Sequence, residues 1–233
     1  MFNQIKSMIW LRTQLLLANP LYLILVILPY TFLITYRVMF GEDLEFIYTL
    51  FTLLPMVYTL TMGQLITSTI AEEKEKNNLE ELQFAGIKET TYILASLFYP
   101  FLFGLLGIVL MPILGGELGF DDNYLSYLTI NILTSISISL IFLIIAMVTK
   151  SVNQGQLLAI PIMIITLFLP VGSLNNEAIK GFAKYTYMGS YIELFQNPAD
   201  SLFSSINFLS LVLWIIILFG INIVCYKKFI KNH

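Results

Sequence analysis

The sequence predicts an all-α integral membrane protein with six transmembrane helices. Two observations support this prediction. The chain of 233 residues is 58% hydrophobic and only 12% charged, whereas soluble domains carry about 25% charged residues. Its apolar residues are also gathered in long runs, and a membrane-spanning helix needs about 20 predominantly apolar residues. The chain is therefore long enough for about six such helices and their connections.

Residues 1–19 are predicted to form an amphipathic helix that lies in the plane of the membrane interface. Apolar residues recur near helical spacing, and polar and basic residues, including Lys6 and Arg12, lie between them. We expect these cations to lie near the lipid headgroups. The alternative is that this stretch only begins the first span. Asn19 followed by Pro20 favours a separate helix, because Asn is a preferred cap and Pro is preferred in the first helical turn.

Residues 20–233 are predicted to form one transmembrane domain. Its apolar runs place spans at residues 20–40, 46–70, 92–114, 125–148, 157–171 and 206–226. The fifth run is short for a span, so its helix is expected to begin within the preceding polar turn.

Two acidic loops are expected between spans, at residues 41–45 and 115–124. The acids of the second loop do not fit the spacing of the twelve-residue calcium loop. No metal site is therefore predicted.

The most charged stretch of the chain is residues 71–90, AEEKEKNNLEELQFAGIKET. Because a charged side chain at a helix centre costs roughly 2.5–3.5 kcal/mol on insertion scales, this stretch is expected in water between the second and third spans. Glu72 and Lys76 form a favourable i,i+4 pair, and Gly86 is a stop signal, so a helix is predicted. Such a helix can dock into a partner or simply separate two spans.

This stretch resembles the coupling-helix signature of the type-2 permease family of ATP-binding-cassette exporters. The family pattern is Glu, a basic residue, Glu, Gly-Thr, a hydrophobic residue, Glu, and a Leu followed four residues later by Pro. The matching residues are Glu73, Lys74, Glu75, Leu79, Glu80 and Leu82. Asn77 and Asn78 stand where Gly-Thr is usual, and Gly86 stands where Pro is usual. The resemblance extends to the layout of the whole chain.

The resemblance implies a permease that forms a homodimer or pairs with a sister permease, and that binds two cytoplasmic ATPase subunits. ATP and Mg²⁺ would be bound by the ATPase subunits, so no cofactor is expected in this chain. The matching residues would form the docking surface, with Leu79 and Leu82 as apolar anchors and the acids facing basic residues of the ATPase. ATP-driven closure would push this coupling helix and the N-terminal interfacial helix, and would open an outward path.

Polar residues within the predicted spans are candidates for lining the transport pathway. Small and hydroxyl residues in a span also favour close helix packing and interhelical hydrogen bonds, which is the alternative role. The candidates are Thr52, Thr59, Thr67, Asn131, Ser135 and Ser139. The last three are spaced four apart, so they stack on one helix face.

Residues 172–204 are too apolar for a solvated loop and too polar for a span. Because tyrosines concentrate at membrane interfaces, we predict one or two short helices that dip into the outer leaflet. Exporters of the resembled family carry such re-entrant helices between the fifth and sixth spans. The candidate outer-gate residues are Tyr185, Tyr187, Tyr191 and Phe195. The alternative is an aromatic cap that only seals the bundle.

The distribution of basic residues predicts the orientation of the chain in the cell membrane. With residues 71–90 in the cytoplasm, only Arg37, Lys180 and Lys184 of the 12 Lys and Arg residues lie outside. Basic residues favour the cytoplasmic side, so both termini are predicted to be cytoplasmic. A composition rich in Ile, Asn, Lys and Phe favours a bacterial source.

The sequence also lacks the motifs of several classes of enzyme and ion-coupled transporter. It has no G-x-x-x-x-G-K-[ST] phosphate loop, no H-E-x-x-H, no Cys/His cluster and no acidic residue in the middle of a span. Ion-coupled carriers usually hold ionisable groups near the membrane midplane, so a non-enzymatic permease driven by a separate ATPase is favoured. A net charge of -3 without a basic patch argues against nucleic acid as a partner.

The predicted function is export of an amphipathic or hydrophobic substrate, because the apolar spans carry no buried charge. The candidates are a membrane-active peptide, including one from which the cell defends itself, or a drug. Export of a lipid-linked glycan and a non-transporting membrane scaffold are the alternatives.

Overall fold

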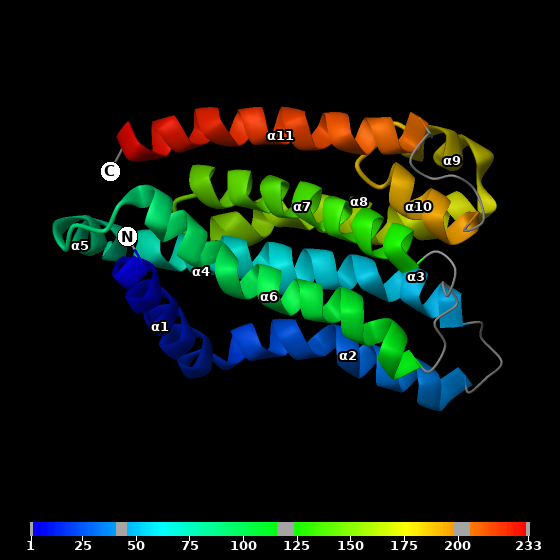
Figure 1. Ribbon diagram of the computed structural model, residues 1–233, viewed down its shortest axis with the longest axis horizontal. Coiled ribbons are helices and arrows are strands. Elements are labelled where there is room, and N and C mark those ends of the chain that lie inside the picture. The colour runs from blue at the N-terminus through cyan, green and yellow to red at the C-terminus, as the bar shows by residue number, and fades with distance from the viewer. Residues whose placement is uncertain (1, 41–45, 116–123, 198–205, 232–233) are drawn as a thin grey trace.

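The computed structural model describes residues 2–40, 46–115, 124–197 and 206–231, and within these ranges it contains helices and short connections but no strand. Six helical segments are long and apolar enough to cross a membrane. They run roughly side by side along the longest dimension of the molecule (Figure 1). The fold is therefore an all-helical bundle with six candidate spans, as the sequence predicts. The acidic loops predicted at residues 41–45 and within 115–124 lie outside the described residues.

The described residues form a series of helices along the chain. They are α1 (Phe2–Ala18), α2 (Pro20–Phe40), α3 (Phe46–Met56), the π-helix η1 (Val57–Gln64), α4 (Leu65–Glu75), α5 (Asn78–Phe84), α6 (Glu89–Gly115), α7 (Tyr124–Val148), α8 (Val152–Asn175), α9 (Glu177–Ala183), α10 (Gly189–Gln196) and α11 (Ile206–Lys231). The fifth span, α8, begins within the polar turn as expected. Its N-cap is Ser151, whose hydroxyl accepts a hydrogen bond from the backbone N–H of Gln154.

The second span is one continuous helical segment made of α3, η1 and α4. It reaches Glu75, five residues beyond the predicted end at residue 70, so its last turn carries charged side chains. The π-helical part follows Pro55, which has no backbone N–H to donate. π-Helical segments are rare and frequently lie at functional sites.

Helix α7 lies at the centre of the bundle and contacts α4, η1, α6, α8, α10 and α11. Tyrosine hydroxyls join the helices around it. Tyr58 of η1 donates a hydrogen bond to the side-chain oxygen of Asn131, and Tyr127 donates to the carbonyl of Ile108 in α6 at 2.9 Å. Both tyrosines are fully buried, so these bonds satisfy polar groups that have no access to solvent.

Helix α1 lies obliquely across one end of the bundle and packs against α2 and α6 (Figure 1). Its buried face consists of Met8, Arg12 and Leu16, which recur every four residues, while Trp10 and Leu17 are exposed. The expectation that the cations of this helix lie among lipid headgroups is wrong for Arg12. Its side chain is buried in the protein, at 4% exposure.

Residues 71–90 do not form a single helix, because two residues with positive φ interrupt them. Asn77, with φ 57°, ends α4, and Gly86, with φ 76°, follows α5. After α5, the N–H of Ile87 donates to the carbonyl of Leu82, and both side chains pack on the same buried cluster. This is the arrangement of a Schellman motif. Asn is among the few residues other than Gly that adopt positive φ readily, which explains Asn77 in place of the usual Gly.

The segment after α8 forms two short helices, α9 and α10, at the end of the bundle opposite α5 (Figure 1). Asn176 caps α9 by accepting hydrogen bonds from the backbone N–H groups of Ala178 and Ile179. Residues 198–204 of the predicted segment lie outside the described residues.

Gly63 of η1 provides a test of helix packing in the centre of the bundle. A Cβ atom at this position would lie 2.6 Å from the ring of Phe142, whereas a Cβ at Gly220 would meet nothing within 4 Å. We expect Gly63→Ala to destabilise the protein by about 1–3 kcal/mol, the usual cost of overpacking. Thermal unfolding of the purified protein in detergent measures this effect. Gly220→Ala is the control and should unfold at or above the wild-type temperature; equal behaviour of both variants would contradict the packing described here.

Candidate functional site

The last turn of α4 contains four consecutive residues, Glu72–Glu73–Lys74–Glu75, and each contacts a different part of the bundle. Successive residues of an α-helix point about 100° apart, so four in a row project around nearly the whole helix. We call these four residues the hub. Its contacts lie at the end of the bundle where α1 begins, α11 ends and α5 is located (Figure 1).

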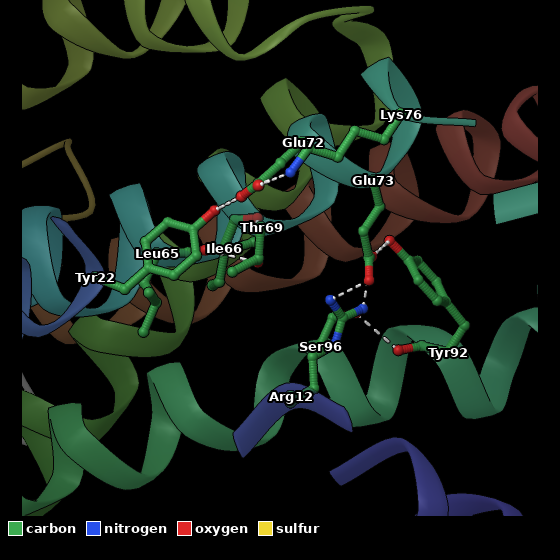
Figure 2. A network of polar contacts seen from close by, with 10 residues as sticks. All are labelled: Arg12, Tyr22, Leu65, Ile66, Thr69, Glu72, Glu73, Lys76, Tyr92 and Ser96. Carbon is green, nitrogen blue, oxygen red and sulfur yellow. Dashed lines mark hydrogen bonds and ion pairs between the residues drawn. The ribbon is translucent and has the colours of Figure 1, made fainter. Parts of the chain in front are cut away.

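Glu73 forms a buried ion pair with Arg12 of α1. The two guanidinium Nη atoms lie 2.5 and 2.7 Å from the two carboxylate oxygens, and one Nη also donates to the hydroxyl of Ser96 in α6 at 2.6 Å. The hydroxyl of Tyr92 in α6 donates to the same carboxylate at 2.5 Å. Figure 2 shows that these four side chains converge from α1, α4 and α6. The ring of Tyr92 also lies 5.1 Å below the guanidinium carbon.

The environment of Arg12 has opposing effects on its pKa. Burial lowers the pKa, but the carboxylate of Glu73 raises it, and the net pKa is above its ordinary value. The guanidinium is therefore held in its charged form. A buried pair of this kind adds little net stability because desolvation opposes the attraction, yet removing one partner leaves an uncompensated charge. The pair therefore fixes which surfaces of α1, α4 and α6 meet.

Glu72 joins α2 to the hub. Its carboxylate accepts a hydrogen bond from the hydroxyl of Tyr22 in α2 and forms an ion pair with the exposed side chain of Lys76 (Figure 2). The hydrogen bond to Glu72 raises the pKa of Lys76 above its ordinary value. This exposed pair is screened by solvent, so its contribution to stability is small.

Lys74 and Glu75 contact helix ends. The ammonium of Lys74 donates to the carbonyls of Ala146, Met147 and Thr149 at 2.6–2.9 Å, which are the last carbonyls of α7 and its connection. The carboxylate of Glu75 accepts from the N–H of Val152, the first residue of α8, at 3.0 Å. A cation at a helix C-terminus and an anion at an N-terminus both match the helix dipole.

Helix α5 follows the hub directly and is attached to the bundle on one side. Leu82 packs on the buried cluster that contains Tyr92, and Gln4 of α1 donates to the carbonyl of Gly86 at 3.1 Å. Glu81 and Phe84 are exposed, and Phe84 is 91% exposed. The side chains of Leu79 and Glu80 lie outside the described part of the chain.

The predicted docking residues therefore differ in how far they are exposed and in what they contact. Glu73 is 3% exposed and Lys74 is half-buried, and both bind within the chain rather than facing outward. Glu75 is exposed but holds the start of α8, and Leu82 anchors α5 to the bundle. Phe84 is not among the predicted docking residues, although an aromatic side chain in a charged helix is visible in the sequence.

A cleft of about 590 Å³ opens beside the hub between α2, the η1–α4 segment and α8. Apolar side chains, including Leu25, Leu60 and Ile160, form part of its wall, while Gln64 and Glu72 add polar groups. The cleft is therefore amphipathic. Gln64 is not among the candidate pathway residues predicted from the sequence.

None of the six predicted pathway residues lines this cleft. Thr59, Thr67 and Asn131 are fully buried and hydrogen-bond to backbone or side-chain groups within the bundle. Thr52 is half-buried, and its hydroxyl donates to the carbonyls of Tyr48 and Thr49. Ser135 donates to the carbonyl of Ile132, whereas the buried hydroxyl of Ser139 has no partner among the described residues. These contacts fit the packing role.

Three of the four predicted gate residues are buried, and two of them, Tyr191 and Phe195, belong to an aromatic cluster with Phe51. Tyr191 stacks on Phe51 with ring centroids 5.7 Å apart, and its hydroxyl donates to the Phe51 carbonyl at 2.8 Å. Phe195 lies 4.9 Å from Tyr191 between ring centroids. The hydroxyl of Tyr187 lies 2.9 Å from that of Thr166 in α8. Tyr185 differs, because its side chain is exposed.

The described part of the chain contains no group of three or more His, Cys, Asp or Glu residues that could hold a metal ion.

Comparison with known proteins gives one match. The family model described as ABC-2 type transporter matches residues 3–198. Neither a search of curated proteins nor a search of solved structures returned a match.

The ion pair between Arg12 and Glu73 gives a direct test of the hub. We expect Glu73→Gln to destabilise the protein by about 3–5 kcal/mol, because Arg12 would stay buried without its counter-charge. The double variant Arg12→Met with Glu73→Leu removes both charges and should recover most of this loss. Unfolding in denaturant measures the stability of each variant. Lys76→Gln is the control, because it breaks only the exposed ion pair between Glu72 and Lys76. The single variants Arg12→Met and Glu73→Leu complete the comparison: if their losses of stability simply add up in the double variant, the pair is not coupled.

Proposed function

Because this chain belongs to the ABC-2 type transporter family, we propose that it is the permease subunit of an ATP-driven exporter, with α5 as the contact for its ATPase. Permease domains of this family are not ATPases themselves, and the family implies partner ATPase subunits. The chain is a multi-pass membrane protein with six candidate spans. The observation on which the proposal chiefly rests is the exposed Phe84 on a helix that directly follows the hub.

The α5 end of the bundle faces the cytoplasm in this proposal. The basic residues of the chain favour this orientation, because only Arg37, Lys180 and Lys184 of the 12 Lys and Arg residues then lie outside. The start of α1 and the end of α11 lie at the α5 end (Figure 1), which supports two cytoplasmic termini. A soluble ATPase could then reach α5.

The docking surface centres on Phe84, with Glu81 beside it and with Leu79 and Glu80 as further contacts. Phe84 is the apolar anchor, since buried aromatic side chains commonly dominate the energy of an interface. The acidic residues of α5 would face basic residues of the ATPase. Leu82 has a separate role, because it holds α5 against the bundle.

A push on α5 would reach the spans through the hub. The four hub residues bind α1, α2, α6, α7 and α8, so a displacement of α4 acts on all of these helices together. The helices α2 and α8 flank the cleft, so such a displacement would change its width.

The substrate is an amphipathic or hydrophobic molecule, such as a membrane-active peptide or a drug. The cleft supports this class because apolar and polar side chains both line it. A second permease, identical or sister, would complete the pathway. The faces of α2 and α8 that are exposed in a single chain would lie against this partner or against lipid.

Phe84→Ser tests the docking surface. We expect the variant to bind the ATPase at least about 30-fold more weakly, because loss of an interface hot spot costs about 2 kcal/mol or more. The measurement is co-purification and titration with the partner ATPase subunit. Phe182→Ser is the matched control, because Phe182 is 65% exposed at the opposite end of the bundle. Unchanged affinity in Phe84→Ser would refute α5 as the main contact.

A further inference from the structure

A second, smaller pocket lies at the end of the bundle opposite the hub. Its volume is about 210 Å³, and α3, the end of α8, α9 and α10 surround it. The residues that matter here are Tyr48, Phe51, Ser173, Glu177, Lys180 and Gln196. The pocket shares none of its lining residues with the cleft beside the hub.

The pocket contains one acidic and one basic side chain that are not paired with each other. Glu177 and Lys180 lie three residues apart on α9, so they share a face of the helix. Among the described residues, the side chains of both form no ion pair and no hydrogen bond. A carboxylate and an ammonium are therefore both available to a ligand.

The uncharged walls of the pocket are fixed by internal contacts. The hydroxyl of Ser173 donates to the carbonyl of Pro170 at 2.6 Å and accepts from the amide nitrogen of Gln196 at 3.1 Å. The ring of Phe51 lies 5.5 Å from that of Phe195 between centroids. Tyr48 also lines the pocket and is half-exposed. These contacts form a preorganised wall with an aromatic side.

Exposed aromatic residues in α9 and directly after it indicate the depth of the pocket in the membrane. Phe182 and Tyr185 project from this segment with 65% and 63% exposure. Aromatic side chains at the end of a transmembrane bundle concentrate at the level of the lipid headgroups. The pocket therefore lies where a headgroup, rather than an acyl chain, would be its neighbour.

We propose that this pocket binds the zwitterionic headgroup of a phospholipid. The phosphate lies at Lys180 and the ammonium at Glu177, so each charge of the headgroup meets its opposite. Tyr48 and Phe51 contact the ammonium or the adjoining methylenes. A primary ammonium also donates hydrogen bonds to Glu177, which a choline group cannot do, so ethanolamine phospholipids bind best. This site does not depend on the proposed pairing with an ATPase.

Lipid titration of the full chain in detergent, followed by native mass spectrometry, tests this proposal. The probes are ethanolamine, choline and glycerol phospholipids with identical acyl chains. The wild-type protein should retain the ethanolamine lipid most strongly. Lys180→Gln should reduce the affinity of this pocket for all three lipids by roughly tenfold, since it removes a charge-assisted hydrogen bond to the phosphate. Glu177→Gln should remove the preference for ethanolamine over glycerol lipid.

Lys184→Gln is the matched control, because Lys184 is an exposed lysine that does not line the pocket. It should retain lipids as the wild type does. An unchanged ethanolamine preference in Glu177→Gln, or tightest binding of the anionic glycerol lipid, would overturn the proposal. Displacement of the lipid by equimolar soluble phosphoethanolamine would also overturn it, because the site would then recognise a free small molecule rather than a membrane lipid.

Discussion

The buried ion pair between Arg12 and Glu73 is the interaction on which the hub end of this protein depends. Neither charge is stable there alone, so each requires the other to be in place. Arg12 brings α1 against α6, and Glu73 fixes the rotation of α4. Once that rotation is set, Lys74 meets the end of α7 and Glu75 meets the start of α8. One pair of side chains thereby determines how several helices meet.

This geometry gives a physical basis for coupling between α5 and the spans. Asn77 turns the chain sharply after the hub, and only Lys76 and Asn77 separate the hub from α5. Leu82 and the Schellman motif hold α5 against the bundle, while Phe84 stays exposed. A partner that binds and moves Phe84 would therefore displace α4 directly, because the connection between α5 and α4 is short. At the opposite end, the aromatic cluster around Tyr191 packs α10 against α3, so the two ends of the second span are held by different contacts.

The sequence predicted the six spans closely, because long apolar runs are a strong and local signal. It also located the charged segment and its resemblance to the coupling signature. It could not show that Glu73 is buried, because its partner Arg12 is 61 residues away and looked like an interfacial cation. The sequence also left two roles open for the six candidate pathway residues, because a buried hydroxyl that bonds to its own helix and one that lines a cleft have the same sequence pattern. Gln64 and Phe84 were visible as residue types, but packing between helices decides that Gln64 lines the cleft and that Phe84 is exposed.

The most direct test of the central claim is a distance measurement across the cleft in the complete complex with the ATPase, in lipid. Spin labels on cysteines at Leu21 of α2 and Leu157 of α8, in a Cys225→Ser background, report the width of the cleft, since both positions are exposed. ATP should change this distance in the parent complex. In the double variant Arg12→Met with Glu73→Leu, the ATPase should remain bound while the ATP-dependent change is lost. The same change in the double variant would contradict transmission through the hub.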